Sequence, residues 1–188
     1  VEKPGRPDFV LFDLDPSDDV GFKETVQVAL LVKQALDTVG LESYPKTSGS
    51  DGIHVLVPIA RRHTYEQTRE FSEIIASALA RAHYGLVTTE WTRRKRRGVL
   101  IDSNQNGEGK TIASVYSVRP REGAPISTPL RWDEVKKGLD PRDFAEQAVP
   151  DRFITHPARR PDRQSRLARP PPARRHAARL GGLPRRAH

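Results

Sequence analysis

The chain has 188 residues, of which 32 are Lys or Arg and 24 are Asp or Glu, and it contains no Cys and no Met. The lack of cysteine excludes a disulfide scaffold, a cysteine-ligated zinc site and a thiol nucleophile. No apolar run approaches the roughly 20 residues of a membrane span, and no signal-peptide pattern opens the chain, so we expect no membrane partner.

Apolar patterning predicts alternating strands and helices in the first 150 residues. We therefore expect an α+β fold, with a mixed, largely antiparallel sheet and helices packed on one face. Segments 86–91 and 98–102 are typical of a hairpin across the basic stretch between them. In chain order the predicted elements are a strand over 8–15, a helix over 22–38 ended by Gly40, strands over 41–46 and 53–59, a helix over 65–83, the hairpin, a strand over 113–118 and a short helix over 132–137.

The last fifth of the chain differs in composition from the rest. Residues 152–188 hold 11 of the 32 basic residues and one acid, so residues 1–151 carry 21 basic and 23 acidic side chains. A segment of mostly Arg, Pro and Ala cannot bury enough apolar surface to fold. We predict a folded domain over 1–151 and a disordered tail over 152–188. The tail is either a polybasic arm for phosphate backbones or an extension without a selected role, such as a GC-rich gene read out of frame.

Two aspartates stand two positions apart at the end of the first predicted strand. Side chains two apart on a strand share a face, so Asp13 and Asp15 project together, opposite Phe12 and Leu14. Two adjacent carboxylates repel each other unless a cation lies between them. Oxygen ligands suit Mg²⁺ or Mn²⁺, so we favour a metal site over a pair of solvated strand-end acids.

Asp102 ends another apolar strand and precedes a polar loop. A third carboxylate from a neighbouring strand would complete a two-metal site of the kind that transfers phosphoryl or nucleotidyl groups. Taken alone, an aspartate at a strand exit is more often a turn former. The interpretation of Asp102 therefore depends on its distance from Asp13 and Asp15.

The segment from Lys46 to His54 is a Gly/Ser loop followed by a histidine on a strand. Backbone N–H groups of such a loop can form a nest for phosphate oxygens, with serine hydroxyls as further donors. An ordinary hairpin loop and a core histidine explain the same residues equally well.

A basic run precedes Gly98, and it is either a solvated hairpin tip or a contact for nucleic-acid phosphates that salt would weaken. The candidate nucleic-acid-binding residues are Arg93, Arg94, Lys95, Arg96 and Arg97.

Four segments together resemble a known family. They are FDLDP at 12–16, TSGSDGIHVLVPI at 47–59, VLIDSNQN at 99–106 and YSVRPREGAPISTPLRWDEV at 116–135. In order and spacing they resemble the polymerase/primase module of bacterial ATP-dependent DNA ligase D, a member of the archaeo-eukaryotic primase superfamily. The resemblance extends over residues 1 to about 150.

This resemblance implies an RRM-like sheet and a set of site residues. Asp13, Asp15 and Asp102 match the metal-binding, catalytic aspartates of the family. The positions that match nucleotide-binding residues of the family are Ser48 with the adjacent Gly49, His54 and Arg119, and Lys46 and Gln105 stand at family-like polar positions.

The activity implied is a nucleotidyltransferase that adds ribo- or deoxynucleotides to a DNA primer, with two divalent ions, Mn²⁺ or Mg²⁺, in non-homologous end joining. The implied partners are DNA primer/template or DNA ends, nucleoside triphosphates, and ligase and end-binding repair proteins. The implied location is the bacterial cytoplasm, at the nucleoid.

The sequence also departs from the family. It begins at Val1, close to the first catalytic strand, so we expect an N-terminal truncation that makes the activity of this chain alone doubtful. Asp51 stands where some members carry Lys, and the tail does not match the family's end. One alternative is a non-catalytic nucleic-acid-binding remnant of the same module. A haloacid-dehalogenase-like phosphatase, suggested by FDLDP alone, is disfavoured because Pro16 and Ser17 follow in place of Gly-Thr.

Overall fold

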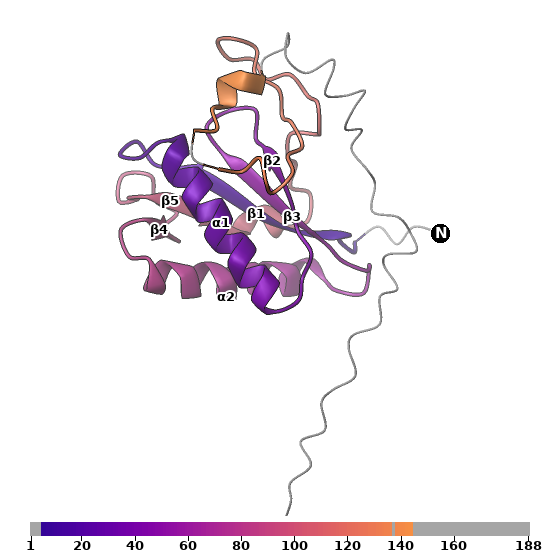
Figure 1. Ribbon diagram of the computed structural model, residues 1–188. Coiled ribbons are helices and arrows are strands. Elements are labelled where there is room, and N and C mark those ends of the chain that lie inside the picture. Colours follow the sequence, from indigo (N-terminus) through magenta and orange to yellow (C-terminus); the bar gives the residue numbers. More distant parts are fainter. Residues whose placement is uncertain (1–4, 137, 145–188) are drawn as a thin grey trace, which may run out of the picture.

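The computed structural model describes residues 5–136 and 138–144, so the predicted boundary at 151 and the tail over 152–188 lie outside the described residues. Five strands form one sheet in the order β2-β3-β1-β5-β4, and β1 is its central strand (Figure 1). The strands are β1 (Phe9–Pro16), β2 (Tyr44–Thr47), β3 (Ile53–Pro58), β4 (Val87–Thr88) and β5 (Val99–Asp102). The helices are α1 (Phe22–Thr38) and α2 (Tyr65–Ala82), with 3₁₀ turns η1 (Ser103–Asn106) and η2 (Pro141–Phe144).

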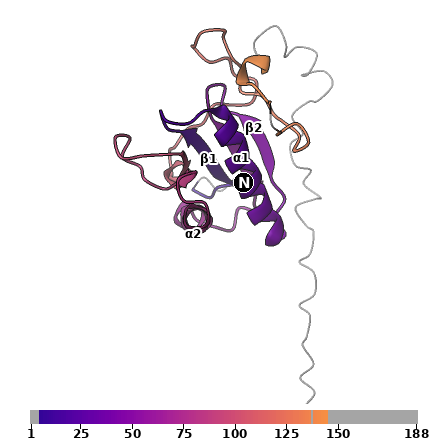
Figure 2. The same ribbon diagram turned by 60° about the vertical axis from the view of Figure 1, so that its left-hand side comes forward.

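The sheet has an apolar face and a polar face, and β1 sets both. Val10, Phe12 and Leu14 are buried in the core with Val32 of α1 and Ala76 of α2, which confirms that the helices pack against one face. In Figure 1, α1 crosses the sheet and α2 runs along its border; Figure 2 views α2 almost along its axis. The intervening residues of β1 point the other way, because strand side chains alternate.

Both long helices begin at the predicted residues. Local contacts explain where α1 ends and where α2 begins. Gly40, with φ of +71°, ends α1, and the N–H of Leu41 donates to the carbonyl of Leu36, as expected for a glycine stop. Thr64 caps α2: its hydroxyl accepts from the N–H of Gln67, whose side chain accepts from the N–H of Thr64.

The predicted hairpin is wrong, because β4 and β5 run parallel, with Val87 opposite Val99 and Thr88 opposite Leu100. A hairpin turn would reverse the chain. Residues 89–98 instead form a longer link that returns the chain to the end of the sheet where β4 begins, so β5 runs in the same direction as β4. The link is held at its end, where the carbonyl of Gly98 accepts from the N–H of Ser17. The rest of the sheet is antiparallel, so the predicted mixed, largely antiparallel sheet is confirmed.

Two further predicted elements do not form. Residues 113–118 are a loop, in which Tyr116 has a φ of +62° that no strand residue adopts. Residues 132–136 form turns instead of a helix, because the indole N–H of Trp132 donates to the carbonyl of Ser43 and ties the segment to the start of β2. The strand expected at 41–46 lies over Tyr44–Thr47.

The segment 126–130 covers the outer edge of β2. The N–H of Thr47 donates to the carbonyl of Thr128, and the N–H of Leu130 donates to the carbonyl of Pro45. Figure 1 shows this orange part of the chain beside β2. Lys46, in the middle of β2, is consequently only 3 % exposed.

Candidate active site

One row of polar residues crosses four strands of the sheet. Lys46 of β2 lies opposite His54 of β3, His54 lies opposite Asp13 of β1, and Asp13 lies opposite Asp102 of β5. Residues directly opposite each other share a face of the sheet. We call Lys46, His54, Asp13 and Asp102 the polar row; it brings predicted nucleotide-binding and metal-binding residues side by side.

Asp15 extends the polar row on the same face of β1. Partial burial raises the pKa of the Asp15 carboxyl above its usual value; the Arg96 guanidinium opposes the shift, and the carboxylates of Asp13 and Asp102 add to it. Three acids therefore interact electrostatically across two strands. This supports the prediction that Asp102 belongs with the paired aspartates of β1.

The carboxylates of β1 already contact nitrogen atoms of basic side chains. Asp13 Oδ1 lies 3.2 Å from His54 Nε2, and Asp15 Oδ2 lies 3.2 Å from Arg96 Nη1. Asp102 Oδ1 accepts a hydrogen bond from the N–H of Asn104. Within residues 5–136 and 138–144, no three His, Cys, Asp or Glu side chains converge closely enough to hold one metal ion.

The donor chemistry nevertheless fits a divalent cation. Carboxylate oxygens are the ligands that Mg²⁺ and Mn²⁺ prefer, and the contacts just described use one oxygen of each aspartate. The three acids repel one another, which a cation among them would relieve.

Arg96 does not belong to a solvated tip. Its side chain is 9 % exposed and faces Asp15, while its Nε is buried without a hydrogen-bond partner in the described part of the chain. Its four neighbours in the basic run, Arg93, Arg94, Lys95 and Arg97, are exposed. Arg93 pairs with Asp18 at 3.1 Å, so the run also contacts the turn that follows β1.

Lys46 is the cation at the opposite end of the polar row. Burial lowers the pKa of Lys46 to about 8; the Asp13 carboxylate opposes this shift, and the Arg119 guanidinium adds to it. Lys46 Nζ donates to Ser127 Oγ at 2.6 Å, and Ser127 Oγ donates to the carbonyl of Thr47 at 2.8 Å. Ser127 is a residue that no sequence pattern singled out, and only the pairing of segment 126–130 with β2 brings it here.

The loop between β2 and β3 closes on the side chain of Ser48. Ser48 Oγ accepts from the N–H groups of Ser50 and Gly52, and the N–H of Ser48 donates to the carbonyl of Gly52. Three amides expected to form a phosphate nest are therefore used within the loop. Because Ser48 Oγ accepts twice, its own hydrogen is available to donate outward.

Arg119 passes directly over Gly49. A Cβ on Gly49 would lie 2.5 Å from Arg119 Cγ and 2.9 Å from the N of Ser127, and Gly49 has a φ of +74°. Only glycine fits such a conformation and such a close approach. The structure thus brings Arg119, Lys46 and the Ser48 loop to one end of the sheet, next to His54.

Gln105 does not join this group. It lies in η1 and lines a cavity of about 300 Å³ with Arg6, Tyr65 and Lys110, beside the start of β1. Its neighbour Asn106 explains the position of η1: the Asn106 side chain accepts from the N–H of Leu11 and donates to the Leu11 carbonyl.

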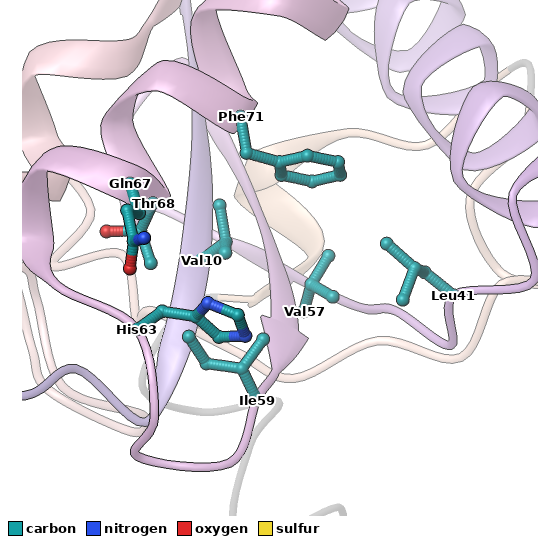
Figure 3. Close-up of a pocket in the computed structure, with 8 residues that line it drawn as sticks. All are labelled: Val10, Leu41, Val57, Ile59, His63, Gln67, Thr68 and Phe71. Atoms are coloured by element: carbon teal, nitrogen blue, oxygen red, sulfur yellow. The ribbon is translucent and has the colours of Figure 1, made fainter. Parts of the chain in front are cut away.

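A separate apolar cavity of about 220 Å³ opens between the helices, on the face opposite the polar row. Figure 3 shows Phe71 of α2 above it, with Leu41, Val57 and Ile59 around it and His63 at the side. This cavity is open to solvent beside His63 and Gln67, and its mostly apolar lining is unsuited to binding phosphates.

The chain matches the family model of the LigD primase-polymerase domain over residues 1–159. It is 40 % identical over 153 residues to the bifunctional non-homologous end joining protein LigD of Bacillus subtilis, covering 80 % of this chain and 25 % of that protein. It is 33 % identical over 149 residues to the multifunctional LigD of Pseudomonas aeruginosa, covering 79 % and 18 %.

The fold is similar to that of a solved polymerase domain from Mycobacterium tuberculosis ligase D in complex with DNA, with a TM-score of 0.75 and 30 % identity over 82 % of this chain and 54 % of that one. The chain thus spans about a quarter or less of the curated relatives it matches. The family model, these relatives and the shared fold agree, and we conclude that the chain belongs to the LigD primase-polymerase domain family, a family of nucleotidyltransferases.

Proposed function

We propose that this chain forms the nucleotidyl-transfer site of a primase-polymerase that adds ribo- or deoxynucleotides to DNA ends during non-homologous end joining. The observation that carries the proposal is the polar row, in which basic and acidic side chains meet on one face of the sheet. A nucleoside triphosphate needs cations for its phosphates, and phosphoryl chemistry needs carboxylates that hold metal ions.

The basic half of the row suits a triphosphate. Lys46 and Arg119 supply positive charge, His54 and the Ser48 hydroxyl supply donors, and all lie at the same end of the sheet. Burial makes the charge of Lys46 effective, because water screens it less there than on an open surface. The role of these four side chains is to bind and orient the triphosphate beside Asp13.

The acidic half suits divalent cations. Asp13, Asp15 and Asp102 would hold Mn²⁺ or Mg²⁺, two ions in the arrangement typical of polymerases. Bound there, the ions would lower the pKa of the primer 3′-hydroxyl and neutralise the triphosphate charge. The 3′-hydroxyl passes its proton to water, its oxygen forms a bond to the α-phosphorus as the bond to the bridging oxygen breaks, and pyrophosphate leaves with the electron pair.

The proposed partners follow from this chemistry. They are nucleoside triphosphates, primer/template DNA or DNA ends, and the ligase and end-binding proteins that complete the repair of a break, at the bacterial nucleoid. The M. tuberculosis relative is a polymerase domain in complex with DNA, which supports DNA as the macromolecular partner.

Primer extension on gapped DNA with ribonucleotides and Mn²⁺ tests the proposal. We expect Asp13→Asn to lower the extension rate at least about a hundredfold, since several kcal/mol of charge stabilisation depend on metal binding. The matched control is Asp37→Asn, an exposed aspartate at the end of α1 that pairs with Lys33, which should extend normally. DNA affinity, measured in the same buffer, should be unchanged in both variants.

The same experiment addresses the second candidate, a non-catalytic nucleic-acid-binding remnant. In favour of it, four basic side chains of the run 93–97 are exposed. If the folded wild-type chain binds gapped DNA but extends no primer, the proposed catalysis is refuted and the remnant is supported. The family match over residues 1–159 removes the reason to consider a phosphatase of the haloacid-dehalogenase type.

A further inference from the structure

A polar cavity of about 260 Å³ opens beside the polar row. Strands β4 and β5 pair only as far as Thr88 and Leu100, and beyond these residues the two backbone segments diverge. The lining of the cavity comes from the departing chain, from the end of β5 with η1, and from α2, and includes Thr89, Trp91, Asp102, Asn104, Glu73 and Ser77.

Trp91 is the aromatic wall of this cavity, and 70 % of its surface is exposed. The other tryptophan, Trp132, is partly buried and donates its indole N–H to Ser43. Exposing a large aromatic surface to water is unfavourable, and Trp91 does so immediately beside a candidate catalytic carboxylate. The exposed ring of Trp91 is therefore suited to stacking against a flat, apolar surface of a binding partner.

The residues that follow Trp91 are cationic. Arg94, Lys95 and Arg97 are exposed within six positions of it, and within the described ranges none of them pairs with a carboxylate. An aromatic side chain flanked by exposed cations is the combination that binds single-stranded nucleic acid, since bases stack on the ring and phosphates contact the cations.

From this geometry we propose that Trp91 is a stacking platform for an unpaired base of the DNA strand next to the reacting 3′-end. The cavity is smaller than the roughly 300–1,000 Å³ of typical small-molecule sites, which suits one base. Glu73 lines it as an acceptor for an exocyclic amino group, and the carboxylates of Glu73 and Asp102 disfavour a phosphate there. The inference rests on the proposed function, because it takes DNA as the bound polymer.

The first test measures binding of gapped DNA to the full chain at several salt concentrations. Trp91→Ala should weaken binding about tenfold, within the roughly 5- to 150-fold range that stacking of one base supplies. The slope of log affinity against log salt should not change, because the tryptophan contacts a base and neutralises no phosphate. The control is Tyr84→Ala: Tyr84 is 97 % exposed, follows α2 and lies outside the cavity, so its removal should leave affinity unchanged.

The second test varies the DNA. An abasic nucleotide next to the primer end should weaken wild-type binding as much as Trp91→Ala does, and the two changes together should cost little more than either alone. In the wild type, DNA should quench the indole fluorescence, and Trp91→Phe should remove this quenching while retaining most of the affinity.

Additive effects of the two changes, or no quenching on DNA that binds tightly, would overturn the stacking role. That failure is distinct from failure of the proposed function, which depends on the loss of extension in Asp13→Asn.

Discussion

Lys46 combines burial with a charge that the proposed reaction needs. Its pKa of about 8 lies near neutral pH, whereas an exposed lysine titrates near 10.4. Because a bound triphosphate favours the charged form, nucleotide binding takes up a proton above pH 8. We predict that affinity is level below pH 8 and falls by up to about tenfold per pH unit above it, as measured by equilibrium titration with a nucleoside triphosphate.

The unliganded protein should respond in the opposite direction. The unfolded chain binds the Lys46 proton more tightly than the folded chain, so the free energy of unfolding rises with pH from about 8 toward 10.5. Lys46→Met should remove the added pH dependence of nucleotide affinity. If the affinity of Lys46→Met still falls with the wild-type profile above pH 8, another group is responsible.

The candidate residues could be named from the sequence because their chemistry is visible there, but the residues that contact them could not. Spacing alone placed Asp13 and Asp15 on one face, since a strand has a fixed period. The Arg96 contact depends on how the link 89–98 folds back onto β1, and a run of five basic residues gives no sign of which one is buried. The contact between Ser127 and Lys46 could not be predicted either, because it depends on how segment 126–130 pairs with β2.

At the scale of elements, periodic segments were predicted well and irregular ones poorly. The bounds of α1 agree at both ends, because a long apolar stripe and a glycine stop define it. The parallel pairing of β4 and β5 was missed because two paired residues leave no pattern that gives their direction. The strand predicted over 113–118 is a loop, and its apolar residue Val118 is 53 % exposed.

The link between β4 and β5 depends on Gly98. Gly98 has a φ of +76°, and a Cβ there would lie 2.5 Å from the carbonyl oxygen of Leu86. We predict that Gly98→Ala lowers the free energy of unfolding by more than the roughly 1–2 kcal/mol of a left-handed residue alone, because backbone must also move. Urea denaturation measures this effect.

Gly109 provides the matched comparison. It has a φ of +75° with nothing within 4 Å of its Cβ position, so Gly109→Ala carries only the conformational cost. Equal losses in the two variants would show that the approach to Leu86 is not tight.

At the scale of the whole molecule, charge is unevenly distributed along the chain. Residues 152–188 hold 11 Arg and one acid, while residues 1–151 are nearly balanced. We predict that a chain ending at 151 still extends primers but binds DNA with a smaller salt slope, by about 0.9 for each phosphate that the tail neutralises. Affinities of both chains for duplex DNA between 50 and 200 mM salt, a range suited to this effect, give the slopes. Identical slopes would leave the tail without a part in DNA binding.

The polar row joins three separate parts of the sequence, with Asp13 in one, Lys46 and His54 in the second and Asp102 in the third. A slip of one residue in any of these pairings would turn that strand's contribution to the opposite face. The four side chains therefore share one face only when all four strands are in register. Nucleotide affinity is, for this chain, also a measure of how many molecules have completed the sheet correctly.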